Sequence, residues 1–177
     1  METSVNAIID NLHSSEPQNQ LSGLDDAKAL VTQLVRQSVE ILFSASNPYG
    51  VAEKLFAMGP SVIPDLQRQL DEGGPPEAMA YAALVLLKLG SQKGVGQLFR
   101  SLKEGIGPTG MIAQGLATAR VPGASEVITE VLMTASASKD PYTAVTLISA
   151  LRELEAPVPE EAFGRLEQSA PNIRKLL

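Results

Sequence analysis

The sequence predicts an all-α fold in which pairs of helices stack behind an N-terminal helical cap. Apolar residues recur three and four positions apart along most of the chain, which places them on one face of a helix, and no segment predicts a strand convincingly. After Pro48 the predicted helices become short, and Gly and Pro residues separate them at regular intervals. The pattern repeats, because Gly59 and Gly90 are 31 residues apart and Leu102 and Leu132 are 30 residues apart. A fixed period that holds two helices and two breakers is typical of a helical solenoid.

The composition indicates one globular domain with an aliphatic core. Apolar residues make up 44% of the 177 residues, which is enough for a sizeable core. Aromatic residues make up only 4% and Trp is absent, so the core must consist of Leu, Val, Ile, Ala and Met. The absence of Cys excludes disulfides and thiolate metal sites, and it is consistent with a reducing compartment.

Residues 1–47 lie outside the repeat, and we assign them to the N-terminal helical cap. Terminal units of a solenoid must shield the open end of its core. A first helix is expected over residues 4–13, where apolar residues have helical spacing. Residues 14–20 are polar and contain Pro17, so we expect a linker there.

A long amphipathic helix is expected to follow this linker and to run to about Phe43. Ser22 and Asp25 resemble a capping box at its start. Steps of three and four residues keep its apolar stripe on one face. The stripe consists of Leu24, Ala27, Val31, Leu34, Val35, Val39 and Leu42.

Residues 48–177 are assigned to helical repeats that form one continuous domain. Helices are expected over residues 48–58, 76–89, 109–119, 124–135 and 160–169, and further helices are expected after Pro60, Ser91, Ser138 and Pro171. Ser91 is expected to cap the helix that follows it. The helix over residues 76–89 is apolar on almost every side, so it must be covered on every side and is expected to be central to the stack.

Three segments align with one another, and a fourth aligns more loosely. The aligned helix ends are residues 55–59, 86–90 and 116–120, and the fourth copy begins at residues 151–154. In each copy the helix end is followed by apolar residues of a second helix.

These segments resemble the HEAT-repeat family in its short bacterial form. The sequence LFAMGPSVIPDL of residues 55–66 closely matches the helix–turn–helix pattern of that family, and so do residues 86–90 with the apolar positions that follow them. The similarity covers roughly residues 48–169. It implies an armadillo-type α-solenoid, in which helix pairs form a right-handed superhelix that presents an extended surface.

No residue pattern predicts a catalytic or metal site, and we expect neither an enzyme nor a cofactor. The single histidine, His13, in a chain without Cys argues against a transition-metal site, and we interpret it as a surface residue. Ser138 and Lys139 lie in a polar loop, where a helix cap is the simpler interpretation than a nucleophile and its base.

Residues 105–110 (GIGPTG) match the dinucleotide-binding pattern G-x-G-x-x-G, and Glu130 lies 20 residues beyond Gly110. That fingerprint requires a strand before the glycines. The preceding residues predict an amphipathic helix instead, so we interpret the segment as a turn between helices.

The charge is acidic but unevenly distributed. The net charge of the chain is −6, with −4 on residues 1–47, +1 on residues 48–120 and −3 on residues 121–177. The middle repeats contain a group of basic residues that attracts an acidic partner if it lines one face. Tyrosines near helix starts are further candidates, because aromatic residues anchor interfaces. The candidate partner-binding surface consists of Tyr49, Lys88, Lys93, Arg100, Lys103, Arg120 and Tyr142.

The hypothesis favoured by the sequence is a non-enzymatic protein–protein interaction scaffold or adaptor. One alternative is an assembly factor, because short HEAT-like repeats resemble those of the phycobilin lyases, which present a chromophore to its target. A second is DNA binding, as in the similar alkylation-repeat DNA glycosylases, but the acidic charge and the lack of Trp disfavour it. We expect a cytoplasmic protein, because no secretory signal is visible and the longest apolar run, residues 78–87, is too short to span a bilayer. The partner and the oligomeric state stay open.

Overall fold

The structure, a computed structural model, describes residues 4–134 and 141–169. Ten α-helices and one short 3-10 helix occupy these ranges, which contain no strand, so the predicted all-α class is confirmed. The helix expected after Pro171 and the Ser138–Lys139 pair lie outside the described residues. None of the described helices is both long and apolar enough to cross a membrane.

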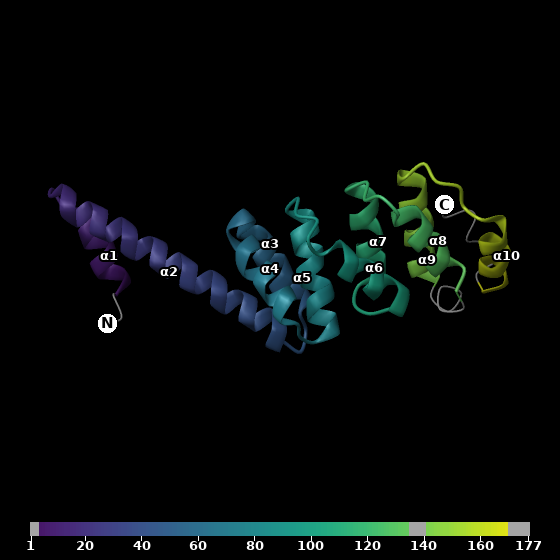
Figure 1. Cartoon of the computed structure of the whole chain (residues 1–177), viewed down its shortest axis with the longest axis horizontal. Helices are drawn as coiled ribbons and strands as arrows, with labels where there is room; N and C mark the ends of the chain where they lie inside the picture. The colour runs from purple at the N-terminus through teal and green to yellow at the C-terminus, as the bar shows by residue number, and fades with distance from the viewer. Residues whose placement is uncertain (1–3, 135–140, 170–177) are drawn as a thin grey trace.

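The helices follow one another along the longest axis of the molecule (Figure 1). Their bounds are α1 (Val5–Leu12), α2 (Pro17–Ser44), α3 (Tyr49–Ala57), η1 (Gly59–Val62), α4 (Ile63–Glu72), α5 (Pro76–Lys88), α6 (Val95–Glu104), α7 (Thr109–Thr118), α8 (Ala124–Leu132), α9 (Pro141–Glu153) and α10 (Glu160–Ser169).

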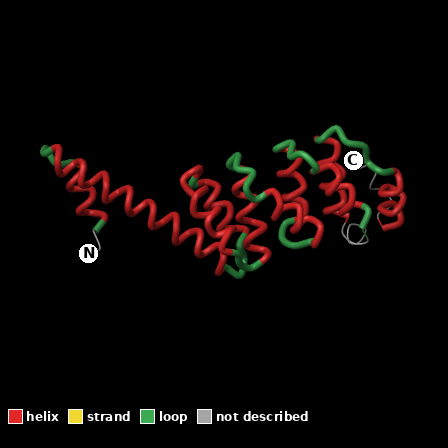
Figure 2. Tube along the Cα trace, viewed as in Figure 1, coloured by secondary structure: helices red, strands yellow, loops and turns green. Residues whose placement is uncertain are grey.

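Helices α3 to α10 form two rows. In the first row α3 contacts α5, α5 contacts α7, and α7 contacts α9. The second row consists of α4, α6, α8 and α10, and each of these helices packs against at least one helix of the first row. Figure 2 shows the resulting series of short helices joined by loops. We call these two rows, with the C-terminal half of α2, the body.

Helix α5 joins the two halves of the core, as its apolar sequence predicts. Nine of its residues are buried. Tyr81, Val85 and Leu86 pack with α2, α3 and α4, while Leu84 and Leu87 pack with the helices from α6 onward. The helix therefore has no solvent face along most of its length.

The aligned copies end their first-row helices in the same backbone conformation. Gly59 and Gly90 have φ values of +71° and +85°, and Arg120 and Glu155, at the equivalent positions, have φ values of +47° and +56°. After three of these four positions the next backbone N–H donates to the carbonyl oxygen of a buried leucine five residues earlier, namely Leu86, Leu116 or Leu151. This bond closes the helix C-terminus. Pro60 follows Gly59 and has no N–H to donate.

The predicted N-terminal linker is wrong, because α2 already begins at Pro17. A proline is tolerated in the first turn of a helix, where its missing N–H would have no partner anyway. Ser22 and Asp25 consequently lie inside α2, and no capping box forms. The turn to α1 is only four residues long, and Gly23 of α2 lies directly against Asn11 and Leu12.

Only the C-terminal half of the predicted α2 stripe is buried. Val35, Val39 and Leu42 belong to the core of the body, whereas Leu24 and Val31 are exposed. The N-terminal half of α2 projects from the body, and α1 folds back along it (Figure 1). We call α1 with this half of α2 the N-terminal hairpin.

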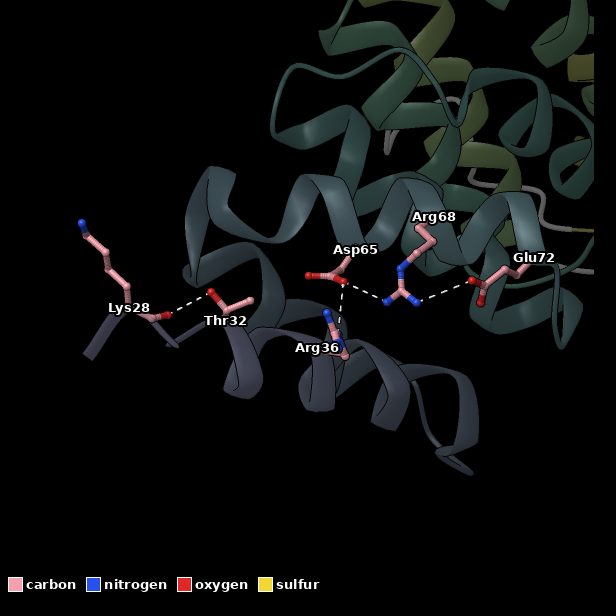
Figure 3. Close-up of polar contacts among 6 residues, drawn as sticks. All are labelled: Lys28, Thr32, Arg36, Asp65, Arg68 and Glu72. Carbon is pink, nitrogen blue, oxygen red and sulfur yellow. Dashed lines mark hydrogen bonds and ion pairs between the residues drawn. The ribbon is translucent and has the colours of Figure 1, made fainter. Parts of the chain in front are cut away.

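An ion-pair network holds α2 to α4 on the side of the body (Figure 3). The Asp65 carboxylate lies 2.8 Å from the Arg68 guanidinium and 4.0 Å from that of Arg36 on α2. Arg68 also lies 3.5 Å from Glu72. Arg36, Arg68 and Glu72 are about half exposed, so these contacts contribute little to stability.

Helix α6 begins at Val95 with Gly94 as its N-cap, so the expected capping by Ser91 is wrong. The Ser91 hydroxyl instead accepts a hydrogen bond from the Gln67 side chain at 3.1 Å. Gly94 is needed because a Cβ there would lie 2.7 Å from the Cβ of Ala83 on α5. This contact sets how closely the second row approaches α5.

We predict that Gly94→Ala lowers the free energy of unfolding by about 1–3 kcal/mol, because the added methyl overpacks the α5–α6 contact. Gly96→Ala is the matched control, since a Cβ at Gly96 meets nothing within 4 Å. It should raise stability by roughly 0.5 kcal/mol through helix propensity. Urea unfolding followed by circular dichroism measures both changes, and equal effects of the two variants would contradict the close approach at Gly94.

Candidate binding groove

A groove with a volume of about 720 Å³ crosses the first row of helices between α3, α5 and α7. Phe56 contributes from the end of α3, Leu87 and Lys88 from the end of α5, and Met111 and Gln114 from α7. Ligand pockets typically have volumes of about 300–1,000 Å³. The groove therefore has room for several side chains of a bound segment.

Gly115 lines the groove and lets α7 lie close to α5. A Cβ at this position would lie 2.9 Å from Cδ1 of the buried Leu84. A larger residue at Gly115 would therefore push the two helices apart. Leu87 and Met111 supply apolar surface beside it.

An aromatic ring and a cation form one side of the groove. Phe56 is 40% exposed and is one of four phenylalanines in the chain. The Lys88 ammonium lies 5.4 Å from the centre of the Phe56 ring and 3.5 Å from the Glu53 carboxylate. These two contacts hold Lys88 across the end of the groove.

Polar atoms on the other side are fixed by Glu153 of α9. Its carboxylate accepts hydrogen bonds from the Thr118 hydroxyl, at 2.8 Å, and from the Gln114 amide. A second hollow, between α7 and α9, also includes Met111 and Gln114. The first row thus presents a continuous hollowed surface, with apolar residues at its centre and a few fixed polar groups at its edges.

The predicted surface residues do not gather at one place. Lys88 lines the groove, and Tyr49 lies on α3, where its ring meets that of the buried Tyr81 edge to face at 6.3 Å. Tyr142 on α9 is exposed. Lys93 precedes α6 in the second row.

Most of the predicted basic residues pair with an acid on a neighbouring element. Besides the Lys88–Glu53 pair, Lys93 and Lys103 each lie 2.6 Å from a carboxylate. Arg120 lies 3.4 Å from Glu155, which also has a positive φ. The partner carboxylates of Lys93 and Lys103 belong to Asp71 and Glu130. These pairs link successive repeats, and the binding role of the seven residues stays a prediction.

The groove residues Phe56, Met111, Gln114 and Gly115 were not predicted as a site. Phe56 and Met111 have the spacing of ordinary core residues, and Gly115 has no distinguishing neighbour in the sequence. One feature of the sequence could have indicated the groove: Phe56 is one of four phenylalanines, and it lies at the end of a predicted repeat helix.

The glycine-rich motif forms a turn between two helices. Residues 105–110 form the turn between α6 and α7, where Gly105 and Gly107 have positive φ. A helix precedes this turn, as predicted, so the segment lacks the strand of a dinucleotide fingerprint. Across residues 4–134 and 141–169, no three His, Cys, Asp or Glu side chains lie close enough to hold a metal ion.

Comparison of the sequence with known protein families and curated proteins, and with solved structures, finds no significant match.

Tyr81, buried at the contact between α3 and α5, is expected to make the stability of the fold depend on pH. Burial raises the pKa of Tyr81 above 10.0, and the nearby Glu77 and Tyr49 raise it further. Folding therefore favours the neutral form of Tyr81, whose pKa is higher in the folded than in the unfolded chain. The stability that results is fully present at pH values below the unfolded pKa. It is lost as the pH rises through the folded pKa.

We predict that the stability of the wild-type protein falls above about pH 10, where an unfolded tyrosine ionises. Tyr81→Phe keeps the ring and removes the ionisable group, so its stability should fall less over the same range. Urea unfolding at a series of pH values measures this difference. Parallel pH curves for the two proteins would show that Tyr81 ionises equally easily in both states.

Proposed function

We propose that the chain is a short HEAT-like α-solenoid, a right-handed superhelix of helix pairs, that acts as a non-enzymatic cytoplasmic scaffold for protein binding. Two observations support the solenoid: the two rows of short helices, and the repeated helix ends at Gly59, Gly90, Arg120 and Glu155. Successive first-row helices expose a surface that suits an extended or helical segment of another protein.

The groove carries the proposal, and the exposed Phe56 ring beside it is the decisive observation. Its apolar centre and polar edges suit a segment that inserts one or two apolar side chains and satisfies its backbone on the groove edges. Lys88 lines the groove, and so do Gln114 and Thr118, which donate to Glu153, so the groove offers a bound segment different polar groups along its length.

The pairing of the basic residues argues against DNA as the ligand. DNA binding requires cations that are available to phosphates along one face. Four of the five basic residues predicted for the surface are paired with carboxylates, and the net charge of the chain is −6.

We predict that Met111→Glu weakens partner binding by about 30-fold or more, because it places a charge at the apolar centre of the groove. Met58→Glu is the matched control, since Met58 is also partly exposed but does not line the groove. Met111 also packs partly against the core, so circular dichroism must show unchanged helix content in both variants before their binding is compared.

Immobilised wild-type protein and both variants are exposed to native extract, and retained proteins are identified by mass spectrometry. A partner of the groove is retained by wild type and by Met58→Glu but not by Met111→Glu, and calorimetry with the purified partner then gives the loss in affinity. Equal retention by all three proteins would place binding elsewhere and contradict the proposal.

A further inference from the structure

Helices α1 and α2 carry most of the large apolar side chains that the described residues expose. Of twelve such residues, eight belong to α1 and α2, five of them to the N-terminal hairpin and three to the C-terminal half of α2. They are Val5, Ile9, Leu12, Leu21, Leu24, Val31, Leu34 and Ile41. A monomeric protein rarely leaves so many apolar residues together on two neighbouring helices, and such patches usually mark an interaction surface.

Four of the five on α2 follow a heptad pattern, and Leu21 lies outside it. The pattern advances in alternating steps of three and four residues through positions 24, 27, 31, 34, 38 and 41. This is the spacing of a coiled-coil seam. We call these six residues, Leu24, Ala27, Val31, Leu34, Ser38 and Ile41, the α2 seam. Its four large side chains are 44–53% exposed, and Ala27 and Ser38 are half-buried.

The α2 seam lies between the two sides of α2 that are already covered. Val35, Val39 and Leu42 face the core of the body, and Gly23 faces α1. The polar contacts of Arg36 are made with α4 (Figure 3). The seam is thus a helix face without a partner among the described residues, although it has the apolar pattern of a packed one.

We propose that the α2 seam binds the same seam of a second copy of this chain, with the two α2 helices antiparallel. This interface is distinct from the groove and goes beyond the proposed function. A two-fold axis between Thr32 and Gln33 places Leu24 opposite the partner's Ile41, and Val31 opposite the partner's Leu34.

The order of side-chain sizes along the seam supports this pairing. From residue 24 to residue 41 the order is large, small, large, large, small, large, and it is the same from either end. In the antiparallel pair every large side chain therefore meets a large one, and Ala27 meets the partner's Ser38. Opposed helix dipoles favour this direction, and the two bodies lie at opposite ends of the interface instead of side by side.

The size of the seam is consistent with a weak dimer. At 1.5 Å per residue it is about 26 Å long, and a helix is about 10 Å wide. With the exposed residues of α1 beside it, two copies bury on the order of 1,000 Å², which is near the lower limit for specific interfaces. A dissociation constant in the micromolar range is expected.

The charge of the hairpin favours a second copy over a membrane surface. Helices that lie on membranes typically carry Lys and Arg on their polar face and are attracted by anionic lipids. Residues 1–47 have a net charge of −4. Lys28 and Arg36, the two basic residues there, already lie 3.8 Å from Asp25 and 4.0 Å from Asp65.

Sedimentation of the full chain over a range of concentrations tests the dimer. Wild type should pass from monomer to dimer with a midpoint in the micromolar range, and Leu34→Glu should raise that midpoint about 30-fold or more, because each dimer then contains two charges near its centre. Gln33→Glu adds the same charge at an exposed residue outside the seam and should leave the midpoint nearly unchanged. A chain that stays monomeric at every concentration, or a dimer that Leu34→Glu leaves intact, overturns the proposal.

Disulfide trapping tests the direction, because the chain has no natural cysteine. In the antiparallel pair the two Leu24 positions are about 25 Å apart, far beyond the reach of a disulfide. Oxidation of an equal mixture of Leu24→Cys and Ile41→Cys proteins should therefore give the mixed dimer, while neither protein alone cross-links. Cross-linking of Leu24→Cys alone overturns the antiparallel arrangement, and neither result depends on the groove.

Discussion

The packing of α5 on all its sides is the constraint on which the rest of the structure depends. One set of its residues completes the core formed with α2, α3 and α4, and another set completes the core that runs from α6 to α10. Neither half of the body has a closed apolar interior without this helix. A large-to-small substitution such as Leu86→Ala removes contacts that no other element can replace, because Leu86 is fully buried. Leu87 and Lys88, at the C-terminal end of α5, also reach the surface of the first row.

The repeat is preserved in backbone geometry even where the residue type changes. Arg120 and Glu155 adopt the left-handed conformation that Gly90 adopts in the equivalent copy, although a side chain makes that conformation costly. The bond from the next N–H to a buried leucine carbonyl is kept in all three copies. The helix end, and not the glycine, is therefore the repeated feature. The carbonyl group at the end of each first-row helix would otherwise be left without a partner.

The sequence predicted the helices and the central position of α5, because periodic burial is a local property that one segment reveals alone. The linker predicted around Pro17 was wrong, because a proline among polar residues is compatible both with a linker and with the first turn of a helix. The sequence also assigned one buried stripe to α2, because periodicity identifies an apolar face but not what covers it. The groove could not be predicted from the sequence either, because it depends on tertiary packing. Phe56 and Gly115 are 59 residues apart and line the same groove only because α3, α5 and α7 pack in one row.

Helix α2 runs without interruption from the N-terminal hairpin into the core of the body, over 28 residues or about 42 Å. It contains no internal proline, so hairpin and body share one stiff axis instead of being joined by a hinge. In the proposed dimer this axis keeps the two grooves at a set separation and orientation. A ligand with two matching segments at that spacing then binds as a bivalent unit, with an effective local concentration that a single chain cannot provide. The length of α2 would in this way act as a molecular ruler that selects ligands by the distance between their segments.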